Sequence, residues 1–237
     1  MRRRLGLLAC DSIWEPLRSR FGDYAEMYTA LLQAAGADFE LKVFAVHRGV
    51  LPAHPRDCDA WLISGSRAGV YDAQPWIATL QNFARAAHAI EVPQVGICFG
   101  HQLLAQALGG RVERAATGWG LGNLEVELRG ESAYPAPTSG PLRLFMAHQD
   151  QVVTLPPDAQ WLAAAAHCRH AAFALGEQVL GVQAHPEFTA DFMREMTLEA
   201  TFEIPPAVRA AALSSFAKPV DSAVIGRWIA TFLGLLS

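Results

Sequence analysis

Residues 95–102 read Val-Gly-Ile-Cys-Phe-Gly-His-Gln: an apolar strand pattern ends at Cys98, and a helical pattern follows at once. Gly96 and Gly100 lie two residues before and two residues after the cysteine. This arrangement is typical of a nucleophile elbow, because larger side chains there would collide where strand and helix pack together. The start of the helix also favours a thiolate, since it presents unpaired amides and partial positive charge. A tight strand–helix turn around a small core cysteine explains the same glycines, so the motif alone leaves both interpretations open.

The first hundred residues alternate between strand and helix patterns. Apolar runs of strand length lie at 4–10, 39–46, 60–64 and 93–98, and amphipathic helical patterns lie at 23–35, 76–90 and 101–108. Such alternation requires parallel strands joined by helical crossovers, and it therefore predicts a layered α/β fold.

The remainder of the chain has a different pattern. Strand-like segments at 118–128, 142–155, 161–166 and 171–184 are separated by turn residues, with a Pro-, Ser- and Gly-rich surface loop expected at 131–141. From Thr189 onward the pattern is helical. We therefore expect an α/β fold with a mostly parallel, three-layer flavodoxin-like sheet, an antiparallel extension and a helical C-terminal tail. Residues 1–188 are expected to form one domain, and residues 189–237 a tail packed on it.

Composition excludes several classes of protein. Hydrophobic residues make up 51% of the chain and charged residues 18%, which excludes a disordered chain. A net charge of −4 gives no reason to expect a nucleic-acid partner. No apolar run reaches the ~18–20 residues that cross a bilayer, so no membrane partner is expected either. The four cysteines form no Cys-x-x-Cys pair or disulfide framework, which favours a reduced, cytoplasmic setting.

A cysteine nucleophile needs a general base and a group that orients it. His185 follows an apolar strand, and Glu187 follows it across Pro186. The carboxyl ends of strands are where α/β folds build their sites, and the short spacing lets the carboxylate reach the imidazole. A His-Pro pair that merely ends a strand is the commoner case, but together with the cysteine elbow the catalytic interpretation is favoured.

The sequences around Cys98 (Gly-Ile-Cys-Phe-Gly-His-Gln) and around His185 (Gly-Val-Gln-Ala-His-Pro-Glu-Phe) together resemble the class I glutamine amidotransferase family with a Cys–His–Glu triad. The resemblance covers roughly residues 5–188, the proposed amidotransferase-like domain. It implies that Cys98 attacks the side-chain amide carbon of glutamine to form a γ-glutamyl thioester. His185 would shuttle the proton to the departing ammonia, Glu187 would hold His185, and water would release glutamate.

The same resemblance implies an oxyanion hole. Residues 62–72 are similar to the family loop that supplies it, and the expected donors are the backbone amides of Ser66 and Phe99. The usual Gly-Gly-Pro is replaced by Gly65-Ser66-Arg67, which retains the amide but lacks the stiffening proline. Gly65 is expected to lie against the substrate.

Other substrate contacts follow from a second similar segment. Residues 146–150, Met-Ala-His-Gln-Asp, resemble the family's Ser-His-Gly-Asp segment, in which backbone groups after the histidine hold the amino-acid end of glutamine. We carry this role to Gln149 and Asp150, and expect the Gln102 side chain to contact the substrate too. His101 and His148 are expected near the site without a catalytic role.

No metal or other cofactor is expected. Residues 167–170 read His-Cys-Arg-His, but three ligands on one strand cannot all point one way, and a fourth partner is missing.

Three functions fit these residues. The first is a glutaminase-type amidotransferase that releases ammonia and glutamate, serving a separate synthase subunit, since the chain has no phosphate-binding loop of its own. The second is a γ-glutamyl peptide or amide hydrolase that uses the same triad with a more open pocket. The third is a catalytically silent regulatory module, which the joint presence of Cys98, His185 and Glu187 disfavours. The sequence does not indicate an oligomeric state.

Overall fold

The structure, a computed structural model, describes residues 2–129, 140–200 and 202–236. Part of the surface loop expected at 131–141 therefore lies outside the described residues. In chain order the elements are β1 (Arg3–Ala9), α1 (Leu17–Phe21), α2 (Tyr24–Ala34), β2 (Phe39–Ala45), the 3₁₀ turns η1 (Val46–Arg48) and η2 (Pro55–Asp57), β3 (Ala60–Ile63), α3 (Pro75–Ala89), β4 (Gln94–Ile97), α4 (Phe99–Ala107), β5 (Arg111–Arg114), β6 (Gly120–Leu128), β7 (Leu142–His148), β8 (Asp150–Thr154), β9 (Gln160–Ala165), β10 (Cys168–Leu175), β11 (Val179–Val182), α5 (Ala190–Glu199), α6 (Pro206–Ser215) and α7 (Ser222–Phe232).

The central sheet joins a parallel half to an antiparallel half. Its nine strands follow the order β2-β1-β3-β4-β11-β10-β9-β6-β7. The strands from β2 to β11 run parallel to their neighbours, whereas every later pairing from β11 to β7 is antiparallel. A separate two-stranded sheet pairs β5 with β8. The predicted mostly parallel sheet with an antiparallel extension is confirmed.

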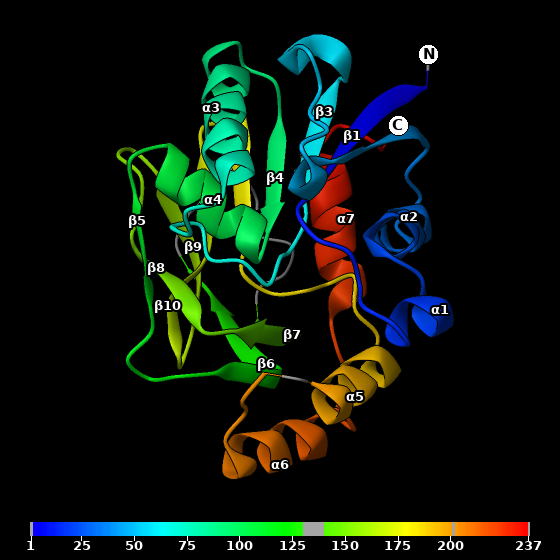
Figure 1. Ribbon diagram of the computed structural model, residues 1–237, viewed down its shortest axis with the longest axis vertical. Helices are drawn as coiled ribbons and strands as arrows, with labels where there is room; N and C mark the ends of the chain where they lie inside the picture. Colours follow the sequence, from blue (N-terminus) through cyan, green and yellow to red (C-terminus); the bar gives the residue numbers. More distant parts are fainter. Residues whose placement is uncertain (1, 130–139, 201, 237) are drawn as a thin grey trace.

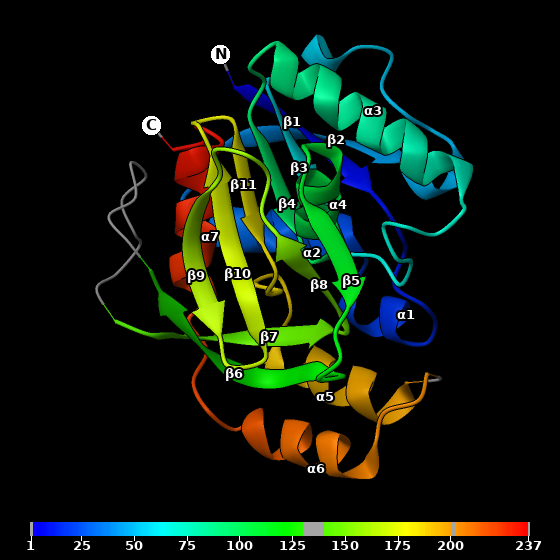
Figure 2. The ribbon, with the colours of Figure 1, turned by 90° about the vertical axis from the view of Figure 1, so that its left-hand side faces the viewer.

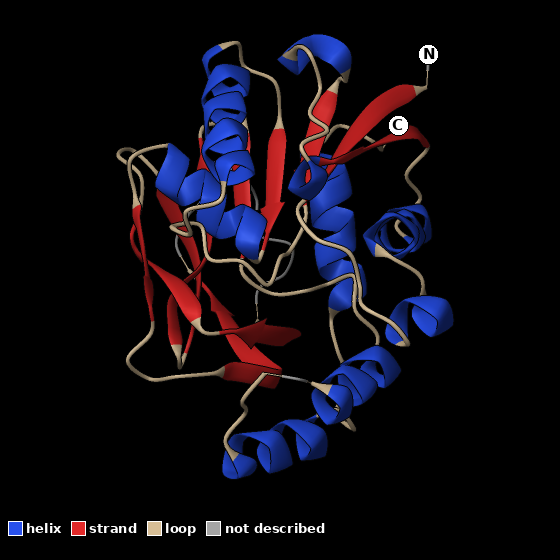
Figure 3. Cartoon of the chain, in the orientation of Figure 1, coloured by secondary structure: helices blue, strands red, loops and turns tan. Residues whose placement is uncertain are grey.

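Helices cover both faces of this sheet, which gives three layers (Figures 1 and 3). Side chains along a strand alternate between faces. Leu5 and Leu7 of β1 accordingly join a core cluster with α2 and α7, and Leu8 joins another with α3 and α4. These strands are apolar on both faces because both faces are covered.

The carboxyl ends of the parallel strands open onto a space bordered by later parts of the chain. In Figures 1 and 2, β6 and β7 turn across the bottom of the molecule, with α5 and α6 beyond them. The helix α7 returns along the sheet, so that Arg3 in β1 donates hydrogen bonds to the carbonyl groups of Leu233 and Gly234. Helices thus form the C-terminal part, as predicted, while the domain division at residue 188 stays a prediction. No helix within the described ranges is long and apolar enough to span a membrane.

Two predicted strands were wrong in their extent. The segment 142–155 is two strands interrupted at Gln149, because β7 pairs with β6 in the large sheet whereas β8 pairs with β5 in the small one. The segment 171–184 also divides, since the chain turns back at Gly176, whose φ is +55°. The short elements α1 and β5 were not predicted at all.

Candidate active site

Cys98 occupies a strained turn between β4 and α4. Its φ is 51° and its ψ −101°, a conformation that costs a non-glycine residue free energy and that is found mostly at functional sites. A Cβ atom on Gly96 would lie 2.3 Å from the carbonyl group of Gly100, and one on Gly100 would lie 2.3 Å from the Ile63 oxygen. The glycines are therefore required by close backbone contact, which is the steric reason given for an elbow.

His185 and Glu187 lie just after β11, the strand next to β4. Ile97 is in register with Val182, and the Cys98 amide donates to the Val182 carbonyl group at 2.9 Å. The chain therefore delivers Cys98 and His185 to the same edge of the sheet. Both residues line one cavity, and both are about 5% exposed or less.

The imidazole and carboxylate are directly paired. His185 Nδ1 lies 2.7 Å from Glu187 Oε1, and the Tyr28 hydroxyl donates to the same oxygen at 3.0 Å. The Phe188 ring stacks on the His185 ring, with centroids 4.2 Å apart and planes 9° apart. These contacts fix the orientation of the ring and leave Nε2 as the nitrogen available to Cys98.

Electrostatics favour a protonated His185. Burial alone lowers its pKa, but the Glu187 carboxylate, a thiolate at Cys98 and hydrogen bonds to both outweigh burial and raise the pKa to about 10. An imidazolium held in this way can donate a proton to a group that departs from a carbon attached to Cys98.

The Gly65-Ser66-Arg67 loop lies against this pair. A Cβ atom on Gly65 would lie 2.9 Å from His185 Cε1, so the backbone there must approach the imidazole closely. Ser66 lines the cavity beside Cys98. Phe99 is the first residue of α4, and the first amides of a helix have no acceptor within the helix.

An ion pair, not a proline, holds this loop. Arg67 donates through Nε and Nη2 to the Asp11 carboxylate, each at 2.8 Å, and its backbone amide donates to Asp11 at 3.1 Å. Burial raises the pKa of Asp11, but the hydrogen bonds from Arg67 more than offset this and lower it. Sequence reasoning missed Asp11 because its partner is 56 positions away.

Three of the four predicted substrate residues, Gln102, Gln149 and Asp150, line the cavity, whereas Gly65 is not among its lining residues. Gln102 Nε2 donates to the Asp150 carbonyl group at 2.8 Å and to Gln183 Oε1 at 3.1 Å. The Gln102 side-chain oxygen is therefore left to accept a hydrogen bond. Arg114 donates to Gln149 Oε1 at 2.7 Å, and the Tyr71 hydroxyl donates to Asp150 at 2.9 Å.

The histidines near the site differ in position. His101 is fully buried against Phe173 and is not among the residues that line the cavity. His148 lines it, with Nδ1 2.9 Å from the Asp150 oxygen and Nε2 3.1 Å from His167 Nε2. Burial lowers the pKa of both His101 and His148 to about 3. In the His-Cys-Arg-His segment, His170 faces the Val152 carbonyl group instead of His167. Over the described ranges no three His, Cys, Asp or Glu side chains gather as metal ligands would.

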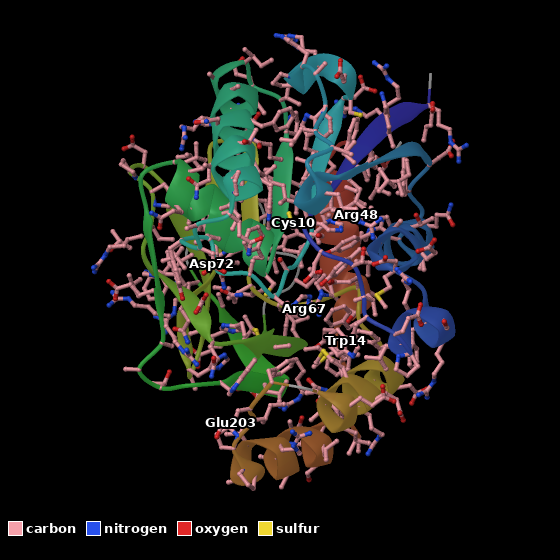
Figure 4. The ribbon with its side chains drawn as sticks, viewed as in Figure 1. Cys10, Trp14, Arg48, Arg67, Asp72 and Glu203 are labelled. Carbon is pink, nitrogen blue, oxygen red and sulfur yellow. The ribbon has the colours of Figure 1, made fainter. Side chains whose placement is uncertain are left out.

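The cavity has a volume of about 500 Å³. The cavity is also lined by Trp14 in the β1–α1 loop and by Arg114 on β5, neither of which was predicted, because no local pattern links them to Cys98 or His185. Tyr71, Asp72, Phe192 and Phe202 line it as well, the last two from the segment after Phe188. Figure 4 shows Trp14 and Arg67 next to each other, with Asp72 on the other side of Arg67.

Three comparisons relate this chain to known proteins. A family model described as glutamine amidotransferase class-I matches residues 23–203. Gamma-glutamyl peptidase 3 of Arabidopsis thaliana is 29% identical over 202 residues, which are 81% of this chain and 79% of that protein. One subunit of a glutamine-hydrolysing GMP synthase from Saccharolobus solfataricus is 33% identical over 168 residues, 70% of this chain and 85% of that protein. A crystal structure of a glutamine amidotransferase from Methylobacillus flagellatus superposes with a TM-score of 0.72 at 24% identity, covering 97% of this chain and 95% of that one.

Proposed function

The chain belongs to the class I glutamine amidotransferase family, and from this premise we propose that it hydrolyses the side-chain amide of glutamine through a γ-glutamyl thioester on Cys98. The observation that carries the proposal is the strained turn of Cys98, which lines one cavity together with His185, whose ring is paired with Glu187. A silent regulatory module has no need of a thiol in a costly backbone conformation.

Each catalytic group has one task. The Cys98 sulfur bonds to the amide carbon, the carbon–nitrogen bond breaks, and protonated His185 gives its proton to the departing nitrogen. Water then attacks the thioester, His185 takes a proton from that water, and the sulfur leaves as a thiolate beside the protonated His185. Glu187, joined to His185 at 2.7 Å, orients the ring and stabilises its charged form. Glutamate and ammonia leave.

Backbone amides stabilise the oxygen during both attacks. The amides of Ser66 and Phe99 are the proposed donors, because preset donors in a water-poor site stabilise developing charge. Support comes from their positions, one in the loop packed against His185 and one at the first turn of α4.

The polar side of the cavity suits an amino acid. Arg114 and Asp150 carry opposite charges there, which fits the carboxylate and ammonium groups of the glutamyl end. Gln102 would accept a hydrogen bond from the substrate, and Gln149 and Asp150 would hold it as predicted.

Hydrolysis of a γ-glutamyl peptide is the second candidate, and the size of the cavity favours it. Glutamine is a small ligand, whereas pockets of about 300–1,000 Å³ hold larger, drug-sized molecules. The cavity of about 500 Å³ therefore has room for a larger leaving group. The likeness to a gamma-glutamyl peptidase supports this candidate, whereas the likeness to part of a GMP synthase supports transfer of ammonia to a separate synthase.

The test measures glutamate and ammonia released from glutamine and from γ-glutamyl dipeptides by the wild type and by Cys98→Ala. We expect turnover by the wild type, none above background by Cys98→Ala, and unchanged turnover by the control Cys58→Ala, a buried cysteine outside the cavity. A glutamine-mimicking affinity label should modify Cys98. Persistent turnover in Cys98→Ala, or labelling of Cys58 or Cys168 instead, would contradict the proposal.

A further inference from the structure

The cavity is divided into two chemically different sides. The polar side carries the charged groups of Asp72, Arg114 and Asp150. The other side, here called the apolar wall, is built by residues from the β1–α1 loop and the C-terminal segment, namely Ile13, Trp14, Phe188, Phe192, Met196 and Phe202. Trp14 and Phe202 are half-buried, so their rings are accessible from the cavity.

The apolar wall begins at the catalytic histidine. Phe188 stacks on the His185 ring, and the Phe192 ring follows with its centroid 4.4 Å from that of Phe188. Farther out, Phe202 stacks on Trp119 at 5.0 Å, and Trp119 Nε1 donates to the Glu203 carbonyl group at 3.0 Å. Two groups of aromatic rings, one on His185 and one around Trp119, thus line the cavity.

The position of the leaving nitrogen determines which part of the substrate contacts the apolar wall. His185 gives its proton to the leaving nitrogen, so that nitrogen must lie on the side of His185. The glutamyl part is held on the opposite side, by the polar groups that match its charges. Whatever is attached to the leaving nitrogen therefore meets the apolar wall.

The charges along the apolar wall exclude one class of leaving group. Of the charged residues that line the cavity, Arg67 is the one against this wall, 5.5 Å from the Trp14 ring centroid. Its guanidinium is already paired with Asp11 through two hydrogen bonds of 2.8 Å. The protonated His185, where this wall begins, is likewise paired with Glu187 at 2.7 Å. A carboxylate on the leaving group would leave water without gaining an unpaired cation among these described residues, which disfavours it.

We propose that the apolar wall is a leaving-group site, and that the preferred substrates are γ-glutamyl amides of uncharged aromatic or aliphatic amines. This inference rests on the proposed thioester chemistry of Cys98 and names a class of substrate beyond glutamine, whose small leaving group, ammonia, would not use the apolar wall. The carbon–nitrogen bond breaks as Cys98 forms the thioester, and the amine departs with the proton from His185. Water then hydrolyses the thioester and releases glutamate. An aromatic ring on the amine packs against the side chains of the apolar wall, where removal of apolar surface from water favours binding.

The experiment compares γ-glutamylbenzylamide with γ-glutamylglycine, whose leaving group carries a carboxylate, by the rate of glutamate release. We expect kcat/KM to be at least about tenfold higher for the benzylamide, a difference typical of one well-filled apolar pocket. Trp14→Ala should lower this ratio about three- to tenfold. The matched control Trp161→Ala removes a half-buried tryptophan that does not line the cavity, and should leave the ratio unchanged.

Binding to Cys98→Ala, measured by calorimetry, separates this inference from the proposed function. Tighter binding of the benzylamide than of the glycine derivative supports the leaving-group site even if no substrate is hydrolysed, an outcome that overturns the proposed function alone. Equal or weaker binding of the benzylamide overturns the leaving-group site, as does a kcat/KM ratio near one in an active enzyme. If Trp14→Ala does not fold, Phe202→Ala takes its place with the same expected loss.

Discussion

Cys98 and Arg114 line the same cavity, yet they are held there in opposite ways. Cys98 is 5% exposed, and its position follows from backbone contacts between β4, α4 and the neighbouring strands. Arg114 is exposed at the end of β5 and reaches Gln149 with a flexible side chain. The close backbone contacts around Cys98 leave no room for an added side chain, whereas the long side chain of Arg114 can change its conformation. Substitutions around the buried Cys98 should therefore reduce stability and turnover. Substitutions at the exposed Arg114 should alter substrate binding.

The largest effect is expected from Gly96→Ala. The new methyl group would lie 2.3 Å from the Gly100 backbone and 2.6 Å from the His101 amide, neither of which can move without displacing the elbow. We expect the free energy of unfolding to fall by about 3 kcal/mol or more in urea titrations. Gly140→Ala is the control, since nothing lies within 4 Å of its added Cβ atom. Equal stability of the two variants would show that the elbow tolerates side chains.

Glu187→Gln should reduce turnover without abolishing it. The glutamine oxygen can still accept from His185 Nδ1, but the charge that stabilises the imidazolium is lost. We expect kcat to fall about 10- to 100-fold, part of the contribution of a general acid–base, and the pH profile of kcat to shift to lower pH. Glu127→Gln, at an exposed position on β6, serves as the control. A loss as complete as that of Cys98→Ala would mean that Glu187 does more than orient the base.

Stability should depend on pH through the same pair. The pKa of His185 is about 10 in the folded protein and close to 6.5 when unfolded, so folding favours the protonated form. The stabilisation is fully present below about pH 6.5 and is lost as pH rises through about 10. We expect the stability advantage of the wild type over Glu187→Gln, about 1–2 kcal/mol at pH 6, to shrink toward pH 10. A constant difference across this range would contradict the ion pair.

The smallest effect is expected from a substitution of the exposed Arg114. Arg114→Ala removes the cation proposed for the substrate carboxylate, and KM for all γ-glutamyl substrates should rise about three- to tenfold, as for the loss of one exposed charge contact. Its free energy of unfolding should stay within about 0.5 kcal/mol of the wild type. Arg111→Ala, on the same strand but outside the cavity, should not change KM. If Arg114→Ala instead unfolds the protein, Arg114 is needed for stability, and the contrast with Cys98 is wrong.

The predictable parts of this molecule are those encoded by neighbouring residues. The strand-to-helix turn around Cys98 depends on glycines two positions away, and the pairing of His185 with Glu187 spans two residues. Both could be found from spacing, because their geometry is local. The break at Gln149 was missed because it depends on which sheet each flanking strand joins, and no local pattern records that choice.

By itself the sequence determined the layered α/β fold, the elbow and the histidine–carboxylate pair, since hydrophobic period and short-range sterics specify them. Only the tertiary structure decided the shape and polarity of the cavity. It brought Asp11 to Arg67, Tyr28 to Glu187, and Phe202 to Trp119. These contacts join residues far apart in the chain. They are set by side-chain packing between whole elements, which no periodicity in the sequence encodes.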